Sequence, residues 1–176
     1  MQTRTRARPA SPKREGGFFL IEALIAILIF SLGILGLVAM GGAAIAAQND
    51  AQYRTEAAAL ADEIASKISL NVDRLNAGNA FPNTAASVAA TLAPFEHQPG
   101  GANCAFTGNA SADPMVVAWV SKVSGAGGLP GATNTSQQIT IQTTNAGNFN
   151  RVTVTLCWQA PNDRAVRQHT LVTYVN

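Results

Sequence analysis

The sequence GGFFLIE, residues 16–22, opens an apolar segment that continues to Ala47. Its only charged residue is Glu22, and its length exceeds the roughly 20 apolar residues that a helix needs to cross a lipid bilayer. A carboxylate in such a segment costs about 2.5–3.5 kcal/mol at the bilayer centre, and less near an end. Because that cost needs an explanation, Glu22 is the first candidate functional residue.

Charge is unevenly distributed along the chain. Residues 1–17 contain five basic residues, one acidic residue and two prolines, which predicts a disordered basic leader. The whole chain has a formal charge of +2, but without the leader it has seven basic and nine acidic residues. This mildly acidic remainder gives little support for nucleic-acid binding. The basic leader favours a cytoplasmic N-terminus.

The apolar segment 18–47 therefore predicts a membrane-spanning helix, with the rest of the chain on the far side of the membrane. A cleaved secretory signal is the alternative, since Ala44-Ile45-Ala46 offers a small-residue cleavage site. The apolar region of such a signal is only about 7–15 residues long, and it would not need Glu22. Four glycines either loosen the helix or allow close packing between membrane helices: Gly33, Gly36, Gly41 and Gly42.

Past Gln48 the composition becomes mixed, but a helical pattern continues. The apolar residues recur every three or four positions, at Ala57, Leu60, Ala61, Ile64, Ile68, Val72 and Leu75. One helix from Phe18 to Leu75 would be about 87 Å long, far more than a bilayer requires. Residues 48–75 are thus expected to form an amphipathic continuation of the helix, packed against a head domain.

Residues 76–176 are expected to form that head. The stretch 76–103 is rich in Asn, Ala, Gly and Pro and supports at most a short helix near Ala85 to Ala93. Asp113 followed by Pro114 matches a helix start, which predicts a helix to about Ser124, although its valines also permit a strand.

One face of the predicted helix 114–124 is apolar, and this pattern favours core packing over ligand binding for Trp119. The face comprises Val116, Trp119, Val120 and Val123. Trp158 follows Cys157 on a predicted strand, and the sequence does not decide whether its side chain enters the core or faces the surface.

The last third of the sequence alternates between apolar and polar residues. The alternation includes Ile139 and Ile141, then Val152 to Leu156, then Leu171 to Val175, which predicts three antiparallel strands. The expected fold class is α+β: a long N-terminal helix packed on a small antiparallel sheet of three to four strands, with a short extra helix.

Cys104 and Cys157 are the only cysteines. In an oxidising compartment they would form one disulfide, and the alternative is two buried reduced thiols. The two histidines, His97 and His169, lie far apart, so the sequence shows no metal-ligand spacing and implies no cofactor.

A hydrolytic site receives no support from the sequence. Ser111, Asp163 and His169 lack a nucleophile elbow or any other activating context. We therefore expect that the chain is not an enzyme and has no catalytic residues.

Several motifs together resemble the type IV pilins, and more narrowly the PilV group of minor pilins. The general motif is a basic leader, Gly17, an aromatic residue, three apolar residues and Glu22. The narrower likeness lies in FSLGILGLVAM (30–40), AQYRTEAAALADEIASKI (51–68), LPG (129–131), and Cys104 followed by Asp113 and Trp119. The resemblance covers most of the chain but is thin from 76 to 103.

This resemblance implies a type IV pilin-like fold and a processing pathway. Prepilin peptidase would cut between Gly17 and Phe18, and the new amine of Phe18 would be methylated. Glu22 would meet the N-terminal amine of a neighbouring subunit during assembly. The implied partners are other minor pilins, the major pilin and the inner-membrane assembly platform. One departure is that many major pilins have a proline in the apolar helix, whereas this chain has none between Pro12 and Pro82.

The resemblance also implies a location, namely the inner membrane before assembly and the pilus or cell surface afterwards. The expected function is priming of filament assembly in a tip complex, and so adhesion, twitching motility or DNA uptake. One alternative is a minor pseudopilin of type II secretion, which shares the leader, the glutamate and the helix. Another is a membrane-anchored adhesin or DNA-binding head, for which the basic residues are sparse: Lys122, Arg151, Arg164 and Arg167.

Overall fold

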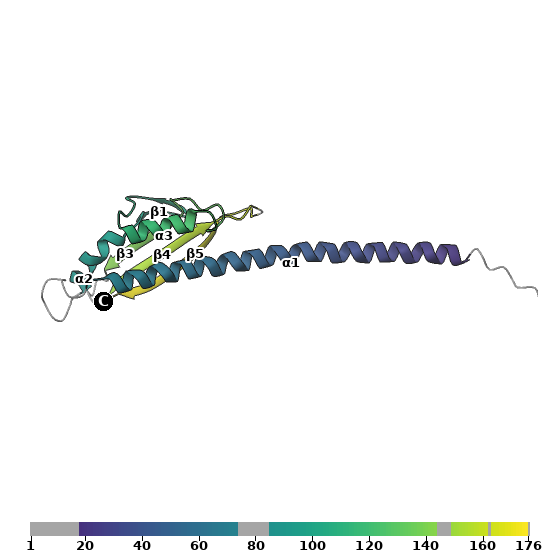
Figure 1. The fold of residues 1–176 in the computed structure, drawn as a ribbon, viewed down its shortest axis with the longest axis horizontal. Helices are drawn as coiled ribbons and strands as arrows, with labels where there is room; N and C mark the ends of the chain where they lie inside the picture. Colours follow the sequence, from purple (N-terminus) through teal and green to yellow (C-terminus); the bar gives the residue numbers. More distant parts are fainter. Residues whose placement is uncertain (1–17, 74–84, 144–148, 162, 176) are drawn as a thin grey trace, which may run out of the picture. The chain divides into compact units, whose positions relative to one another are not determined.

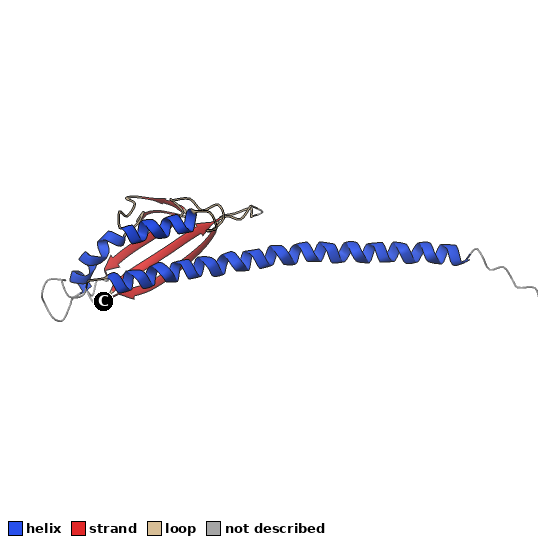
Figure 2. Ribbon diagram, viewed as in Figure 1, coloured by secondary structure: helices blue, strands red, loops and turns tan. Residues whose placement is uncertain are grey.

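The structure, a computed structural model, describes residues 18–73, 85–143, 149–161 and 163–175. The chain divides into two compact units, Met1–Ala47 and Gln48–Asn176. Figures 1 and 2 show the helices and strands. The helical elements are α1 (Phe18–Asn71), α2 (Ala85–Leu92), the 3-10 turn η1 (Ala93–Phe95) and α3 (Pro114–Ser124). The strands are β1 (Gly100–Ala102), β2 (Ala105–Thr107), β3 (Gln137–Thr143), β4 (Asn150–Trp158) and β5 (Arg167–Val175).

The first unit contains the apolar part of α1, which is helical throughout the described residues 18–47, as predicted. Its large apolar side chains, from Phe19 to Ile45, are between 45% and 76% exposed. The helix is long and apolar enough to span a membrane. The helix continues unbroken through the four glycines between 33 and 42, and outside the helix backbone no described atom lies within 4 Å of a Cβ built on them. Close packing between membrane helices at these glycines stays a prediction.

The second part of α1 belongs to the second unit and ends earlier than predicted. The helix stops at Asn71; Val72 and Asp73 are not helical, and Leu75 lies outside the described residues. The side chain of Asn71 donates to the carbonyl of Lys67 at 2.9 Å, and such local bonds compete with continued helix. The buried stripe follows the predicted spacing of three and four: Ala57, Leu60, Ala61, Ile64, Ala65, Ile68 and Val72.

The helix α3 forms as predicted, and the strand alternative is wrong. The carboxylate of Asp113 accepts hydrogen bonds from the amides of Met115 (2.9 Å) and Val116 (3.4 Å), and Pro114 occupies the first turn. This cap satisfies amides that have no partner within a helix. The four apolar residues of the predicted face are all buried, including Trp119.

Three antiparallel strands form the main sheet, in the order β3–β4–β5. The register pairs Ile139 with Val154, and Val154 with Leu171. Alternate residues of the central strand β4 enter the core: Val152, Val154, Leu156 and Trp158. Trp158 is thereby a core residue. Figure 1 shows α3 and the C-terminal half of α1 lying along this sheet, and their apolar faces complete the core.

The stretch 85–107 contains one predicted element and one that was not predicted. The helix α2 matches the expected short helix to within a residue. The hairpin of β1 and β2 was missed; its turn holds Asn103 and Cys104, both in the left-handed backbone region at φ 53° and 65°. The second unit is therefore α+β, with sheets of three and two strands.

Candidate functional site

Glu22 is the one charged residue between Phe18 and Ala47 and lies in the second turn of α1. Its side chain is exposed, and its carboxylate has no ion pair or hydrogen bond with any residue that the structure describes. The apolar neighbours Phe19 and Ile21 are 76% and 56% exposed. A negative charge is thus presented on a helix surface that is otherwise apolar.

Phe18, the first residue of α1, lies four residues before Glu22 and therefore on the same side of the helix. The helix begins at Phe18, and residues four apart in an α-helix are neighbours on one face. Gly17 and the rest of the leader lie outside the described residues. A cut after Gly17 would therefore place a free amine one helical turn from Glu22, and the cut itself stays a prediction.

An ion pair between Glu63 and Lys122 connects α1 to α3 in the second unit. Glu63 accepts from Lys122 of α3 at 2.6 Å and from Lys67 of its own helix at 2.7 Å. The hydrogen bond from Lys122, together with that from Lys67, lowers the pKa of Glu63. Because these side chains remain partly exposed, each pair contributes only about 0.2–1 kcal/mol of stability.

The chain holds one buried histidine, His97, which is 3% exposed. Its backbone pairs with Ile139 of β3, and its Nδ1 accepts from the amide of Ser111 at 3.1 Å. Burial lowers the pKa of His97, so the side chain is neutral at pH 7. Its isolated place in a loop offers no periodic signal, and sequence reasoning did not identify it as buried.

The three residues weighed for hydrolysis do not form a site. The hydroxyl of Ser111 donates to the carbonyl of Pro94 at 2.6 Å, and Asp163 pairs with Arg167. His169 lies on β5 and has no hydrogen bond to either of them among the described residues. In the part of the chain that the structure describes, no three metal-ligating side chains gather either.

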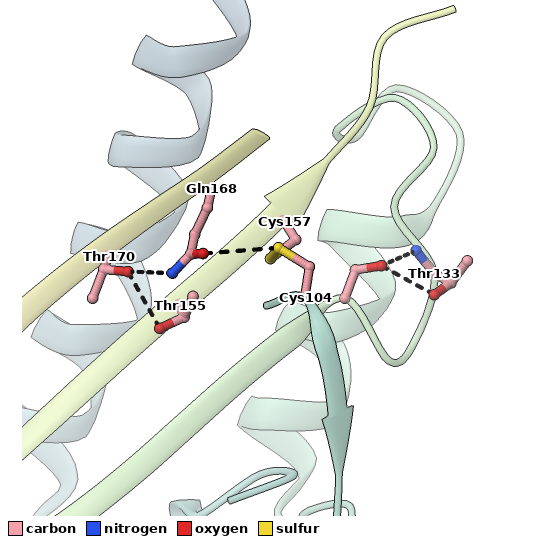
Figure 3. Close-up of a disulfide and its surroundings, with 7 residues drawn as sticks. Cys104, Thr133, Thr155, Cys157, Gln168 and Thr170 are labelled. Atoms are coloured by element: carbon pink, nitrogen blue, oxygen red, sulfur yellow. Dashed lines mark hydrogen bonds between the residues drawn. A yellow bond between two sulfur atoms is a disulfide. The ribbon is translucent and has the colours of Figure 1, made fainter. Parts of the chain in front are cut away.

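A disulfide joins Cys104 to Cys157, as predicted, and the alternative of two free thiols is wrong. It links the β1–β2 turn to the end of β4, with a Cα–Cα distance of 5.7 Å (Figure 3). Cys157 is buried at 2% exposure. The side chain of Gln168 on β5 lies 3.9 Å from the sulfur of Cys104, so the bridge sits against the sheet.

The basic residues of the head do not form a continuous patch. Lys122 is paired with Glu63, and Arg167 is paired with Asp163 and Asp50. Arg151 lies on β4, where it donates to the side chain of Gln142. Two of the four bases are thus paired with carboxylates, which leaves little of the electrostatic attraction that nucleic-acid binding needs.

No family model, curated protein or solved structure matches the chain. A functional conclusion therefore depends on the motif around Glu22 and on the geometry described above. The carboxylate of Glu22, close to the start of α1, has no partner among the described residues and is the strongest candidate for an intermolecular contact.

Proposed function

We propose that the chain is a non-enzymatic minor pilin of the PilV type, which helps to prime the assembly of a type IV pilus and adopts the type IV pilin fold. The observation that carries the proposal is Glu22, a carboxylate without a partner among the described residues, one turn from the start of a helix with exposed apolar side chains. Exposed apolar surface of this extent is characteristic of segments covered by lipid or by other protein chains. A lone carboxylate within it needs an opposite charge.

Cleavage of the leader supplies the opposite charge, which is the new N-terminal amine of Phe18. Prepilin peptidase removes residues 1–17 on the cytoplasmic side, and the amine of Phe18 is then methylated. In a growing filament Glu22 pairs with the amine of a neighbouring subunit, which sets the register between subunits. The apolar residues of α1 leave the bilayer and pack in the filament core, together with other minor pilins and the major pilin. Adhesion, twitching motility or DNA uptake then depends on the filament.

The test is complementation of a deletion strain. Glu22→Gln keeps the size of the side chain and removes its charge, and Gly17→Val blocks processing. We expect both variants to accumulate in the inner membrane, as measured by immunoblot, and to fail to restore surface pili. Glu56→Gln is the matched control, since it removes a carboxylate of the same helix outside the apolar segment and is expected to restore piliation.

Three readouts decide the result: surface pili, secretion into the medium, and the amount of membrane-bound chain. Normal piliation with both Glu22→Gln and Gly17→Val contradicts the proposal. Intact piliation combined with lost secretion identifies a pseudopilin of type II secretion instead.

A further inference from the structure

The two outer edges of the sheet β3–β4–β5 differ. The edge of β3 is covered, because His97 and Ile139 exchange two backbone hydrogen bonds of 3.0 and 2.9 Å. The side chain of Gln138 also donates to the carbonyls of Gln98 and Gly100, both at 2.9 Å. The strand β5, in contrast, pairs only with β4 among the described residues. We therefore call the β3 edge, which is blocked around Ile139, the closed edge, and the β5 edge the open edge.

After Arg167, the open edge of β5 has no proline or lysine of the kind that usually prevents strand pairing. The strand is nine residues long, RQHTLVTYV, and contains neither proline nor lysine. Its register with β4 runs without a bulge from Val175 to Arg167. Proteins generally shorten, charge, twist or cover such an edge, because its unpaired amides and carbonyls accept a further strand. A strand edge that is left free in this way is suited to binding an extended segment of another chain.

A groove with a volume of about 430 Å³ lies between α1 and the edge strand β5. Its β-strand side is formed by the consecutive residues Leu171, Val172 and Thr173. On α1 its wall includes the small side chains of Ala65 and Ser66. These small residues leave space beside the strand, as an added strand would require.

The groove presents one carboxylate and two exposed apolar side chains to an occupant. Asp62 on its wall is exposed and has no ion pair or hydrogen bond with a described residue. Leu70 and Val172 at the groove are 82% and 47% exposed. An occupant with an apolar side chain beside Leu70 and a basic one beside Asp62 complements both features.

A second copy of the chain fits this groove poorly. Pairing of β5 with the β5 of another copy would form a symmetric interface that contains the same patch twice. Two Asp62 carboxylates would then enter one interface, and like charges in an interface disfavour association. A different protein that supplies the basic residue satisfies the charge.

We propose that β5 is a docking edge, to which an extended basic segment of a partner protein adds as a further strand. The segment bonds to the backbone of residues 171–173 and places a Lys or Arg side chain against Asp62. This inference deepens the proposed function and rests on it, because it names the surface through which an assembling subunit selects a partner.

The test measures amide hydrogen exchange of β5 by mass spectrometry, on the full chain in detergent micelles. The probes are two synthetic peptides with the same strand-forming pattern, the basic KVTVTVK and the acidic EVTVTVE. We expect the basic peptide to slow exchange at residues 171–173 several-fold and the acidic peptide to have little effect. Asp62→Lys is expected to reverse this preference, and Asp62→Asn to abolish it.

Glu96→Lys is the matched control, since it makes the same charge change beside the closed edge of the sheet. It is expected to leave the preference for the basic peptide unchanged. Unchanged exchange with both peptides, equal protection by both, or insensitivity to Asp62→Lys overturns the proposal. Protection that grows with the concentration of the chain alone also overturns it, and identifies a second copy as the occupant.

The exchange experiment is independent of filament assembly. The chain with Glu22→Gln is expected to show the same protection by the basic peptide, because Glu22 lies in the other compact unit. A failure at β5 with loss of pili in Glu22→Gln refutes only the docking edge. Protection at β5 with normal piliation in the Glu22 and Gly17 variants refutes only the proposed function.

Discussion

The indole nitrogen of Trp119 donates a hydrogen bond to the backbone carbonyl of Leu60 at 2.9 Å. Trp119 is 1% exposed and Leu60 is 5% exposed, so the bond is shielded from water. It joins the centre of α3 to the N-terminal part of the buried stripe of α1. One of the two tryptophans of the core thus fixes how the two helices meet.

Truncation of this tryptophan is expected to destabilise the head strongly. Trp119→Ala leaves a cavity and should lower the free energy of unfolding by about 3–5 kcal/mol. Trp119→Phe keeps a ring but loses the bond to Leu60, and should cost about 1–2 kcal/mol. Urea unfolding followed by circular dichroism measures both. Val117→Ala, on the exposed side of α3, is the control and should change stability by less than about 0.5 kcal/mol.

The cap of α3 gives a second prediction. Asp113→Ala removes the acceptor for the amides of Met115 and Val116, and should cost about 0.5–2 kcal/mol in the same unfolding measurement. Asp113→Ser restores a capping hydroxyl and should recover most of that loss. Equal stability of the Ala and Ser variants would contradict a capping role.

Stability is expected to depend on pH through His97. Burial lowers its pKa below the ordinary value of 6.5. Below pH 6.5 the unfolded chain therefore binds a proton that the folded chain does not, and stability falls by up to about 1.4 kcal/mol per pH unit. The full stability is present above pH 6.5. Glu63 does not interfere, because its lowered pKa confines its own effect to pH values below 4.5.

Urea midpoints between pH 5 and 8 check this prediction. His97→Asn retains an acceptor near the position of Nδ1 and should flatten the pH dependence over this range. His169→Asn, a change of the other histidine, should retain it. A pH dependence that survives His97→Asn and disappears in His169→Asn would contradict the prediction, because it would show that His169 causes the effect.

The disulfide gives a fourth prediction. Cys104 and Cys157 are 53 residues apart, and a closed loop of that size stabilises a fold by about 4 kcal/mol in the chain-entropy model. The double substitution Cys104→Ala and Cys157→Ala should lower the free energy of unfolding by that order. Dithiothreitol should destabilise the native chain to a similar degree and leave the double variant unaffected. A double variant as stable as the native chain would refute the prediction.

The long helix and the main strands were predictable because each buries one face. The spacing of Leu60, Ile64 and Ile68 indicates which side of α1 enters the core. The pair Asp113-Pro114 indicates where α3 begins, and alternation in Val152 to Leu156 indicates β4. In each case burial of a periodic surface leaves a periodic sequence.

The β1–β2 hairpin leaves no such signal. Its strands have three residues each, too few to establish an alternation. Both residues at the centre of its turn, Asn103 and Cys104, have positive φ, a geometry usually marked by Asn-Gly. With cysteine in place of the glycine, the usual mark is absent.

Some candidate sites could likewise be predicted from the sequence, and one could not. Glu22 stands out as a single charge in an apolar run, and two cysteines allow only one intramolecular pair. The open edge of β5 could not be predicted, because local alternation shows that a strand exists but not which strand is central. That information depends on the pairing of β4 with both of its neighbours.

The closed edge of β3 also limits aggregation. A cross-β fibre grows because every chain in it offers two free edges, one above and one below. The main sheet of this head offers one among its described strands. At β3, the bridge between His97 and Ile139 occupies backbone groups that a further strand would need. Growth on the β3 side is thereby hindered, so an exposed β5 does not give this sheet the two free edges that an endless stack needs.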